Sequence, residues 1–187
     1  MLMATKKERK DKPKPPELTL KVILSFVHQL ALGMECISNH RLVHKDLAAR
    51  NCLVSSDLNL KISLSALAKD TYNKEYFMYR NKYLPIRWLP YEVISEDDYS
   101  CKSDVYSFAA TSWEIFMGGE LPFTSQSDEE VLNMLESGTV TWTHPKSSPE
   151  DMNTLLDKCW SSNPSERPNF SYIALKIGDL MSEVNKS

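Results

Sequence analysis

One short segment gathers the polar side chains best suited to chemistry: residues 44–51, His-Lys-Asp-Leu-Ala-Ala-Arg-Asn. The carboxylate of Asp46 can accept a proton from a hydroxyl group that lies within hydrogen-bond reach. Asp and Asn side chains also hydrogen-bond loop backbones well, so Asp46 and Asn51 could serve only to hold this loop in shape. A catalytic role and a structural role therefore both stay open for these two residues.

Hydrophobic spacing indicates which elements would position this segment. Apolar residues recur at helical spacing from Thr19 and stop at residues 39–40, which predicts a helix before the segment. Two short apolar runs, 52–54 and 60–63, predict a small hairpin directly after it. After a Tyr-rich, turn-like stretch over 70–83, the pattern predicts helices over 104–117, 128–136, 149–160 and 170–183. We expect these helices to begin at Ser103, Ser127, Ser148 followed by Pro149, and Asn169.

Length and composition indicate one globular domain. The chain has 187 residues, of which 42% are hydrophobic and 25% charged, enough for one buried core and too few for two ordinary domains. Residues 1–17 are basic and Pro-rich, with few apolar side chains to offset the entropy of ordering, so we expect them to be disordered. A basic binding arm is the alternative. The domain would then span 18–183, followed by a short tail at 184–187.

The global properties exclude some classes of partner. A net charge of -3 gives no reason to expect nucleic acid. Four cysteines lie far apart without metal-ligand spacing, which is typical of buried free thiols in a reducing compartment. The sequence shows no signal peptide and no apolar run near the ~18 residues of a membrane span. We therefore expect a cytoplasmic protein with no metal.

Several motifs, in order and at fitting intervals, resemble those of protein tyrosine kinases. Residues 44–51 are similar to the catalytic loop HRDLAARN, with Lys45 in place of one Arg. Residues 87–92 resemble RWMAPE, residues 103–108 resemble SDVWSF, and Cys159-Trp160 with Arg167-Pro168 resembles the family's CW…RP ending. The resemblance implies a mainly α fold, namely the helical C-terminal lobe of a kinase with one small β-hairpin. Only some forty residues precede His44, so we expect the N-terminal lobe to be absent from this chain.

Within the tyrosine kinases, the chain resembles the colon-carcinoma-kinase/off-track type of receptor pseudokinase. Those proteins also have Gly-Met-Glu before the loop, here residues 33–35, together with His-Lys-Asp and no DFG motif. The resemblance implies the tail of a single-pass receptor in Wnt and planar-polarity signalling. Its place would be the cytoplasmic face of the plasma membrane, attached only through upstream sequence. Its partners would be signalling proteins, among them phosphotyrosine-binding or Wnt-pathway components.

The resemblance also assigns roles in phosphoryl transfer. Asp46 would accept the substrate proton beside Arg50, Asn51 would hold a magnesium ion, and Leu53 would line a vestigial nucleotide cleft. Leu64 stands 18 positions after Asp46, where the family carries the Asp of DFG. Leucine offers no oxygen to a hard cation, and comparable electrostatic losses cost about 2.7–4 kcal/mol each. We therefore expect no phosphotransfer and no cofactor, with ATP and Mg²⁺ required only if the chain is active.

Other matching positions have structural or regulatory roles in the family. Tyr72 and Tyr76 resemble activation-loop phosphosites, although both could be packed loop aromatics. His44 belongs to the structural part of the catalytic loop, and Asp104 resembles the residue that holds the loop backbone. Glu92 and Arg167 would form an ion pair that ties the end of the activation loop to the last helices. Lys45 cannot reproduce the two-pronged contact of the Arg it replaces.

Three interpretations are in competition. The first is a catalytically inactive scaffold that presents a kinase fold to signalling partners. The second is an active tyrosine kinase whose N-lobe is missing from this chain and in which another metal ligand replaces the lost one. Asp57 and Asp70 are the nearest spare carboxylates, but neither is in the register of the motif. The third is a truncated product without a stable fold, because the exposed lobe interface would leave an apolar patch. Magnesium-dependent ATP binding and cooperative unfolding would separate them.

Overall fold

Helix α1 (Leu20–Asn39) begins where the apolar periodicity begins. Thr19 is its N-cap, and its Oγ1 accepts a hydrogen bond from the amide of Val22 at 3.4 Å. We describe this and the other elements from a computed structural model that covers residues 18–63 and 73–186. The helix buries one face, which includes Leu24, Val27 and Leu30. The predicted helix is therefore confirmed, and it leads directly into the loop at 44–48.

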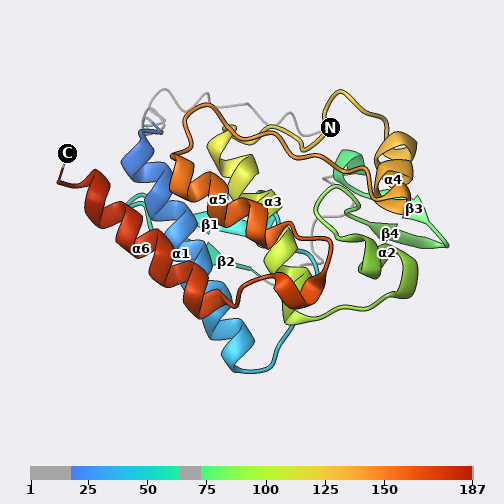
Figure 1. Ribbon diagram of the computed structural model, residues 1–187, viewed down its shortest axis with the longest axis horizontal. Coiled ribbons are helices and arrows are strands. Elements are labelled where there is room, and N and C mark those ends of the chain that lie inside the picture. Colours follow the sequence, from blue (N-terminus) through green and yellow to red (C-terminus); the bar gives the residue numbers. More distant parts are fainter. Residues whose placement is uncertain (1–17, 64–72, 187) are drawn as a thin grey trace, which may run out of the picture.

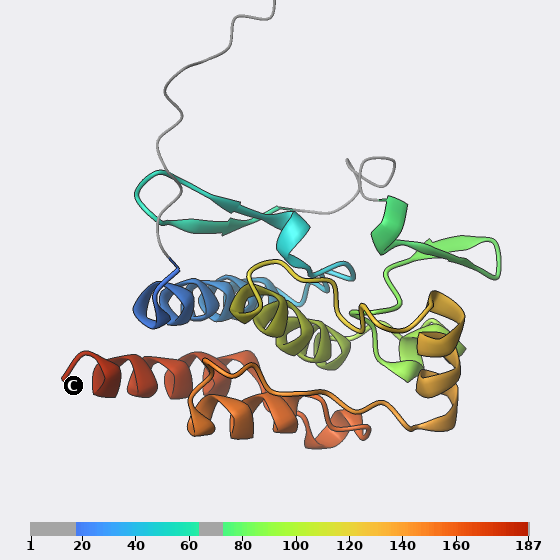
Figure 2. The same ribbon diagram turned by 90° about the horizontal axis from the view of Figure 1, so that it is seen from above.

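The elements around α1 form three layers, which are separated most clearly in Figure 2. The first layer is a hairpin of β1 (Cys52–Val54) and β2 (Leu60–Ile62), paired antiparallel with Cys52 opposite Ile62. The second layer contains α1 and α3 (Cys101–Phe116), and the third contains α5 (Glu150–Cys159) and α6 (Phe170–Val184). The largest apolar cluster lies between these layers. Figure 1 shows α6 running alongside α1 across the molecule.

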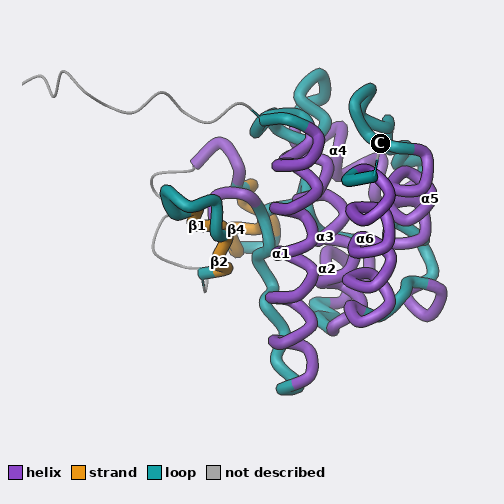
Figure 3. The backbone as a smooth tube through the Cα atoms, turned by 90° about the vertical axis from the view of Figure 1, so that its left-hand side faces the viewer, coloured by secondary structure: helices purple, strands orange, loops and turns teal. Residues whose placement is uncertain are grey.

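A second hairpin corrects the expectation of one hairpin and a turn-like stretch over 70–83. Strands β3 (Phe77–Tyr79) and β4 (Lys82–Leu84) pair antiparallel. The connecting residues Arg80 and Asn81 both have positive φ, 47° and 62°, as two-residue hairpin turns require. Short strands of three residues carry too little alternation to reveal this hairpin in the sequence. Both hairpins lie on the same side of the helical body in Figure 3.

A smaller apolar cluster supports the second hairpin. It joins β4 to α2 (Tyr91–Glu96) and α4 (Asp128–Ser137) through Leu84, Val93, Val131 and Leu135. The remaining elements are short 3₁₀ turns: η1 (Ala49–Asn51), η2 (Asn73–Glu75) and η3 (Pro164–Glu166).

Two of the predicted helix starts were wrong by one turn or less. Helix α3 begins at Cys101, and Ser100 is its N-cap, whereas Ser103 lies inside the helix and completes a capping box with Ser100. Helix α5 begins at Glu150, so Pro149 is the N-cap rather than the first helical residue. The predicted caps Ser127 and Asn169 are confirmed. Two capping serines three residues apart explain the first error, because either could begin the helix.

Helix α1 also corrects the expectation that no segment could span a membrane. The helix has 20 residues, and an 18-residue window within it has a mean hydropathy of 1.5, so it is long and apolar enough to cross a bilayer by length and composition alone. In the structure, however, Leu24, Val27, Leu30 and Met34 are fully buried against neighbouring elements. A core helix gives the same composition, and the packing identifies α1 as one.

Candidate functional site

The loop that carries Asp46 is held by a buried carboxylate on α3. Asp104 Oδ2 accepts a hydrogen bond from the amide of His44 at 2.7 Å, and its Oδ1 accepts one from the amide of Lys45 at 3.0 Å. Lys45 has φ of 71°, a conformation that costs energy in any residue other than glycine. Burial raises the pKa of Asp104, although the two backbone bonds favour its charged form. Asp104 therefore fixes a strained turn, the role that the resemblance assigned to it.

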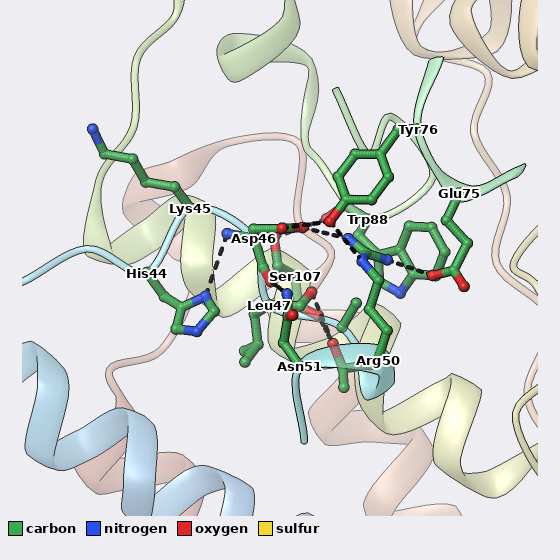
Figure 4. Close-up of polar contacts among 12 residues, drawn as sticks. His44, Lys45, Asp46, Leu47, Arg50, Asn51, Glu75, Tyr76, Trp88 and Ser107 are labelled. Carbon is green, nitrogen blue, oxygen red and sulfur yellow. Dashed lines mark hydrogen bonds and ion pairs between the residues drawn. The ribbon is translucent and has the colours of Figure 1, made fainter. Parts of the chain in front are cut away.

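The carboxylate of Asp46 accepts hydrogen bonds from other side chains of the same chain. Arg50 Nη2 donates to Oδ1, and the phenol of Tyr76 donates to Oδ2 at 2.7 Å (Figure 4). Asn51 Nδ2 donates to the Asp46 carbonyl oxygen at 2.6 Å, which is the backbone role considered from the sequence. Lys45 points away from this cluster in Figure 4, and its Nζ lies 5.1 Å from the ring centre of Tyr99. Both oxygens of the candidate base are therefore engaged.

Arg50 organises the other side of the site. Its guanidinium donates to Glu75 Oε2 at 2.7 Å and to the Tyr76 phenol at 2.9 Å. It also lies 4.6 Å from the ring centres of Tyr76 and Trp88. Burial opposes the charge, but Asp46, Tyr76 and Glu75 outweigh it and raise the pKa of Arg50. The cation is thus locked between two carboxylates and two aromatic rings.

Glu114 is a site residue that no sequence motif identified. Its Oε2 accepts hydrogen bonds from the amide of Ala49 and from Trp88 Nε1, each at 3.0 Å. Burial is the largest cause of its pKa being raised, and the two hydrogen bonds lower it. Glu114 is the single charged residue between Asp104 and Phe116, and this isolated charge in a buried helix was the signal that could have revealed it.

A cavity of about 390 Å³ opens beside Asp46. Tyr76, Tyr83, Pro85 and Tyr99 contribute to its walls, together with the loop at 44–46. Burial and the hydrogen bond to Asp46 are the main causes that raise the pKa of the Tyr76 phenol to about 12. The phenol therefore stays protonated at neutral pH and remains a hydrogen-bond donor to Asp46.

The other residues that match family motifs make structural contacts. Glu92 and Arg167 form the expected ion pair, with Nη1–Oε1 at 2.5 Å and Nη2–Oε2 at 3.2 Å. Arg167 also donates to the carbonyl oxygens of Ser161 and Lys102. His44 Nε2 lies 2.9 Å from the Ser63 carbonyl oxygen. These contacts hold the loop and the last helices in place.

Residues expected near a nucleotide are only partly described. Leu53 lies on β1 with 63% of its surface exposed, whereas Leu64 and Tyr72 lie outside the described residues. Asp57 is exposed in the β1–β2 turn, and Asp70 is also outside the described residues. Within 18–63 and 73–186, no three His, Cys, Asp or Glu side chains form a group that could hold a metal ion.

Comparison with known proteins decides the family. The family model for protein tyrosine and serine/threonine kinases matches residues 6–177, which is most of the chain. The chain belongs to this kinase family. The described helices and short hairpins correspond to the C-terminal lobe of the kinase fold, as the motifs indicated.

The kinase relatives are of the type that the sequence resembled. The chain is 44% identical to "Inactive tyrosine-protein kinase 7" from Gallus gallus, and equally to that from Homo sapiens, over 173 residues. It is 41% identical to "Tyrosine-protein kinase-like otk" from Drosophila ananassae over the same length. These alignments cover 92% of this chain but only 16–17% of the relatives. The chain thus spans about a sixth of the proteins that it matches.

Proposed function

We propose that this kinase lobe does not transfer phosphate and acts by binding signalling proteins. The observation that carries the proposal is the closed carboxylate of Asp46, which accepts hydrogen bonds from both Arg50 and Tyr76. A substrate hydroxyl would have to compete with the Tyr76 phenol and the Arg50 guanidinium for this carboxylate. The sequence adds a second obstacle, because Leu64 replaces the acidic metal ligand.

The chemistry explains why the second obstacle is severe. Phosphoryl transfer depends mainly on positioning and on neutralising charge across the β- and γ-phosphates, which magnesium supplies when it is bound. In this chain Asn51 could contribute one metal ligand, its Oδ1, while its Nδ2 donates to the Asp46 carbonyl oxygen. Leu64 contributes no ligand. The residues present therefore fit a magnesium-bound nucleotide poorly, while the scaffold formed by Asp104, Glu114 and Arg167 is intact.

The wider context of the proposal comes from the relatives. Two of them carry the word "inactive" in their names, and the identity of 41–44% extends over nearly all of this chain. We propose a role in the cytoplasmic tail of a receptor of the Wnt and planar-polarity type, at the inner face of the plasma membrane. There the lobe would bind Wnt-pathway or phosphotyrosine-binding proteins.

An isotope-transfer assay tests the loss of catalysis. Purified chain is incubated with labelled ATP, Mg²⁺ and a tyrosine peptide, and compared with the Asp46→Asn variant. We expect equal background label in both proteins. The wild-type and Asp46→Asn sequences are also compared within any longer protein that contains the chain. A lack of activity there cannot be attributed to a missing N-lobe. Label above background that Asp46→Asn abolishes would overturn the proposal.

A cell-based rescue tests the binding role. Cells that lack the gene are complemented with the wild-type sequence or with Asp46→Asn, and the signalling output is measured at equal expression. A protein that acts by binding should rescue equally well in both forms. Rescue by the wild type alone would show that the carboxylate is needed for function.

A further inference from the structure

A second groove, separate from the cavity beside Asp46, is not used by the proposed function. It has a volume of about 590 Å³ and lies between the start of α2, the end of α4 and the connection from α5 to η3. It shares no lining residue with the cavity beside Asp46. Its function can therefore be considered independently of phosphoryl transfer.

The floor of the groove is a rigid aromatic surface. Trp142 and Trp160 stack with ring centres 4.4 Å apart and planes 2° apart. Trp142 Nε1 donates to the Tyr106 phenol at 3.2 Å, and its ring packs 4.5 Å from Phe123. Because these contacts come from within the fold, the surface is formed before any ligand arrives. Preformed grooves lined by aromatic side chains are known binding sites for extended proline-rich segments.

The charges at the groove favour a basic ligand. Its lining includes three carboxylates, those of Glu92, Glu136 and Asp157, and one cationic residue, Arg167. Arg167 is already paired with Glu92. Asp157 contacts His144 Nε2 at 2.8 Å, and within the described part of the chain Glu136 accepts one hydrogen bond, from the Tyr79 phenol at 3.5 Å. Lysine side chains near these two carboxylates would gain ionic contacts.

The chain itself contains a segment with this chemistry. Residues 10–16 read Lys-Asp-Lys-Pro-Lys-Pro-Pro, and further cations precede them at Lys6, Lys7 and Arg9. Proline restricts the backbone to the extended polyproline II conformation, so such a segment loses little entropy when it binds. The sequence alone is compatible with a binding arm in this stretch, and the groove offers the matching surface.

The prolines of this segment are separated from α1 by too few residues to reach the groove of their own chain. The prolines precede Leu18 by two to five residues, which span at most about 18 Å when extended. Helix α1 alone is about 30 Å long. Arg167 of the groove bonds to Lys102, and the neighbouring Cys101 contacts Leu42, just past the end of α1. Figures 1 and 2 likewise show the start of α1 at the opposite end of the molecule from α2 and α4.

We propose that the groove binds residues 10–16 of a second copy of this chain, so that two copies exchange their basic, proline-rich segments. Each copy supplies one segment and one groove, and the two contacts are equivalent, as in a closed twofold dimer. The interaction requires the aromatic floor, the rim carboxylates and the prolines together. It does not depend on whether the chain transfers phosphate.

Sedimentation of the full chain tests the exchange. We expect the weight-average mass to rise from one copy towards two with concentration, and an excess of synthetic peptide 6–17 to return it to one copy. Glu136→Lys should raise the dissociation constant roughly tenfold, equivalent to about 1.4 kcal/mol. Glu120→Lys changes the charge equally at an exposed position outside the groove and should have no effect. Circular dichroism confirms that both variants are folded.

The contribution of the prolines to dimer affinity is measured with the variant Pro13→Ala/Pro15→Ala/Pro16→Ala, which keeps every charge. We expect its dimer to be weaker than that of the wild type at every salt concentration. A single-copy mass at all concentrations, with no binding of labelled peptide 6–17, would overturn the proposal. An equal loss of dimer affinity in Glu136→Lys and Glu120→Lys would indicate general charge attraction instead of binding in the groove. A dimer that survives both excess peptide and the triple variant would place the interface elsewhere.

Discussion

The phenol of Tyr76 donates a hydrogen bond to Asp46 Oδ2 at 2.7 Å, so the candidate base is covered by a tyrosine of its own chain. Arg50 stabilises this arrangement, because its guanidinium bonds to both residues. Only 8% of Tyr76 is exposed. A residue that resembles a phosphorylation site by position is therefore held inside the fold, with its hydroxyl group in use.

This contact predicts that Tyr76 resists phosphorylation by another tyrosine kinase. The folded chain is incubated with a kinase of broad specificity, and the modified sites are identified by mass spectrometry. Tyr83, which is 54% exposed on the neighbouring strand, serves as the internal control. We expect phosphate on Tyr83 and little on Tyr76 until the chain is unfolded. Comparable early labelling of both residues would show that the Tyr76 contact opens readily.

Replacing Arg167 by Ala should destabilise the domain strongly. Only 1% of Arg167 is exposed, and the change would leave the partly buried carboxylate of Glu92 without its cation. Breaking such a pair typically costs about 3–5 kcal/mol. Lys82→Ala breaks the surface pair with Asp97, whose side chains are 58% and 59% exposed, and should cost less than about 1 kcal/mol. Urea unfolding of both variants gives the comparison, and equal losses would contradict the assigned role of Arg167.

Ser100 should contribute more to stability than an ordinary helical serine. Its hydroxyl oxygen accepts hydrogen bonds from the amides of Lys102 and Ser103 at the start of α3. We expect Ser100→Ala to lower the free energy of unfolding by about 1 kcal/mol. Ser182→Ala, on the exposed surface of α6, removes only a bond to the Gly178 carbonyl oxygen and should be close to neutral. Thermal unfolding of the two variants measures the difference.

The sequence predicted the long elements well because their signals are local. The apolar period of α1 and the capping box at Ser127 each specify a helix without reference to the rest of the chain. The β3–β4 hairpin was missed because its turn uses Arg80, which is not a typical residue for positive φ. Its strands are stabilised by Leu84 packing against α2 and α4, which no local pattern reveals.

The sequence indicated individual residues of the candidate site but not the contacts between them. Motif positions identified Asp46, and the resemblance indicated what Asp104 contacts, because the family keeps those residues in order. The contact between Asp46 and Tyr76 joins residues 30 positions apart, and that between Glu114 and Ala49 joins residues 65 apart. Such contacts depend on tertiary packing. Composition and spacing alone could not predict that the base would be covered.

Glu114 offers a test of how the buried network responds to pH. Burial raises its pKa above the ordinary value of 4.5. At pH values below 4.5, Glu114 is protonated in both the folded and the unfolded state. As pH rises, the unfolded state loses its proton first, so the contribution of Glu114 to stability falls until pH exceeds the folded-state pKa. The same sign applies to Asp104, whose pKa is also raised by burial.

Replacing Glu114 by Gln removes one of these titrations and keeps an acceptor for both donors. The amide of Ala49 and Trp88 Nε1 bond to the same oxygen, Oε2, which the Gln carbonyl can replace. We therefore expect the wild type to lose stability relative to Glu114→Gln as pH rises from about 4 towards 7. Asp104 titrates in both proteins, so the difference between their urea unfolding curves isolates Glu114. Parallel pH profiles would mean that the hydrogen bonds fully compensate the burial of this carboxylate.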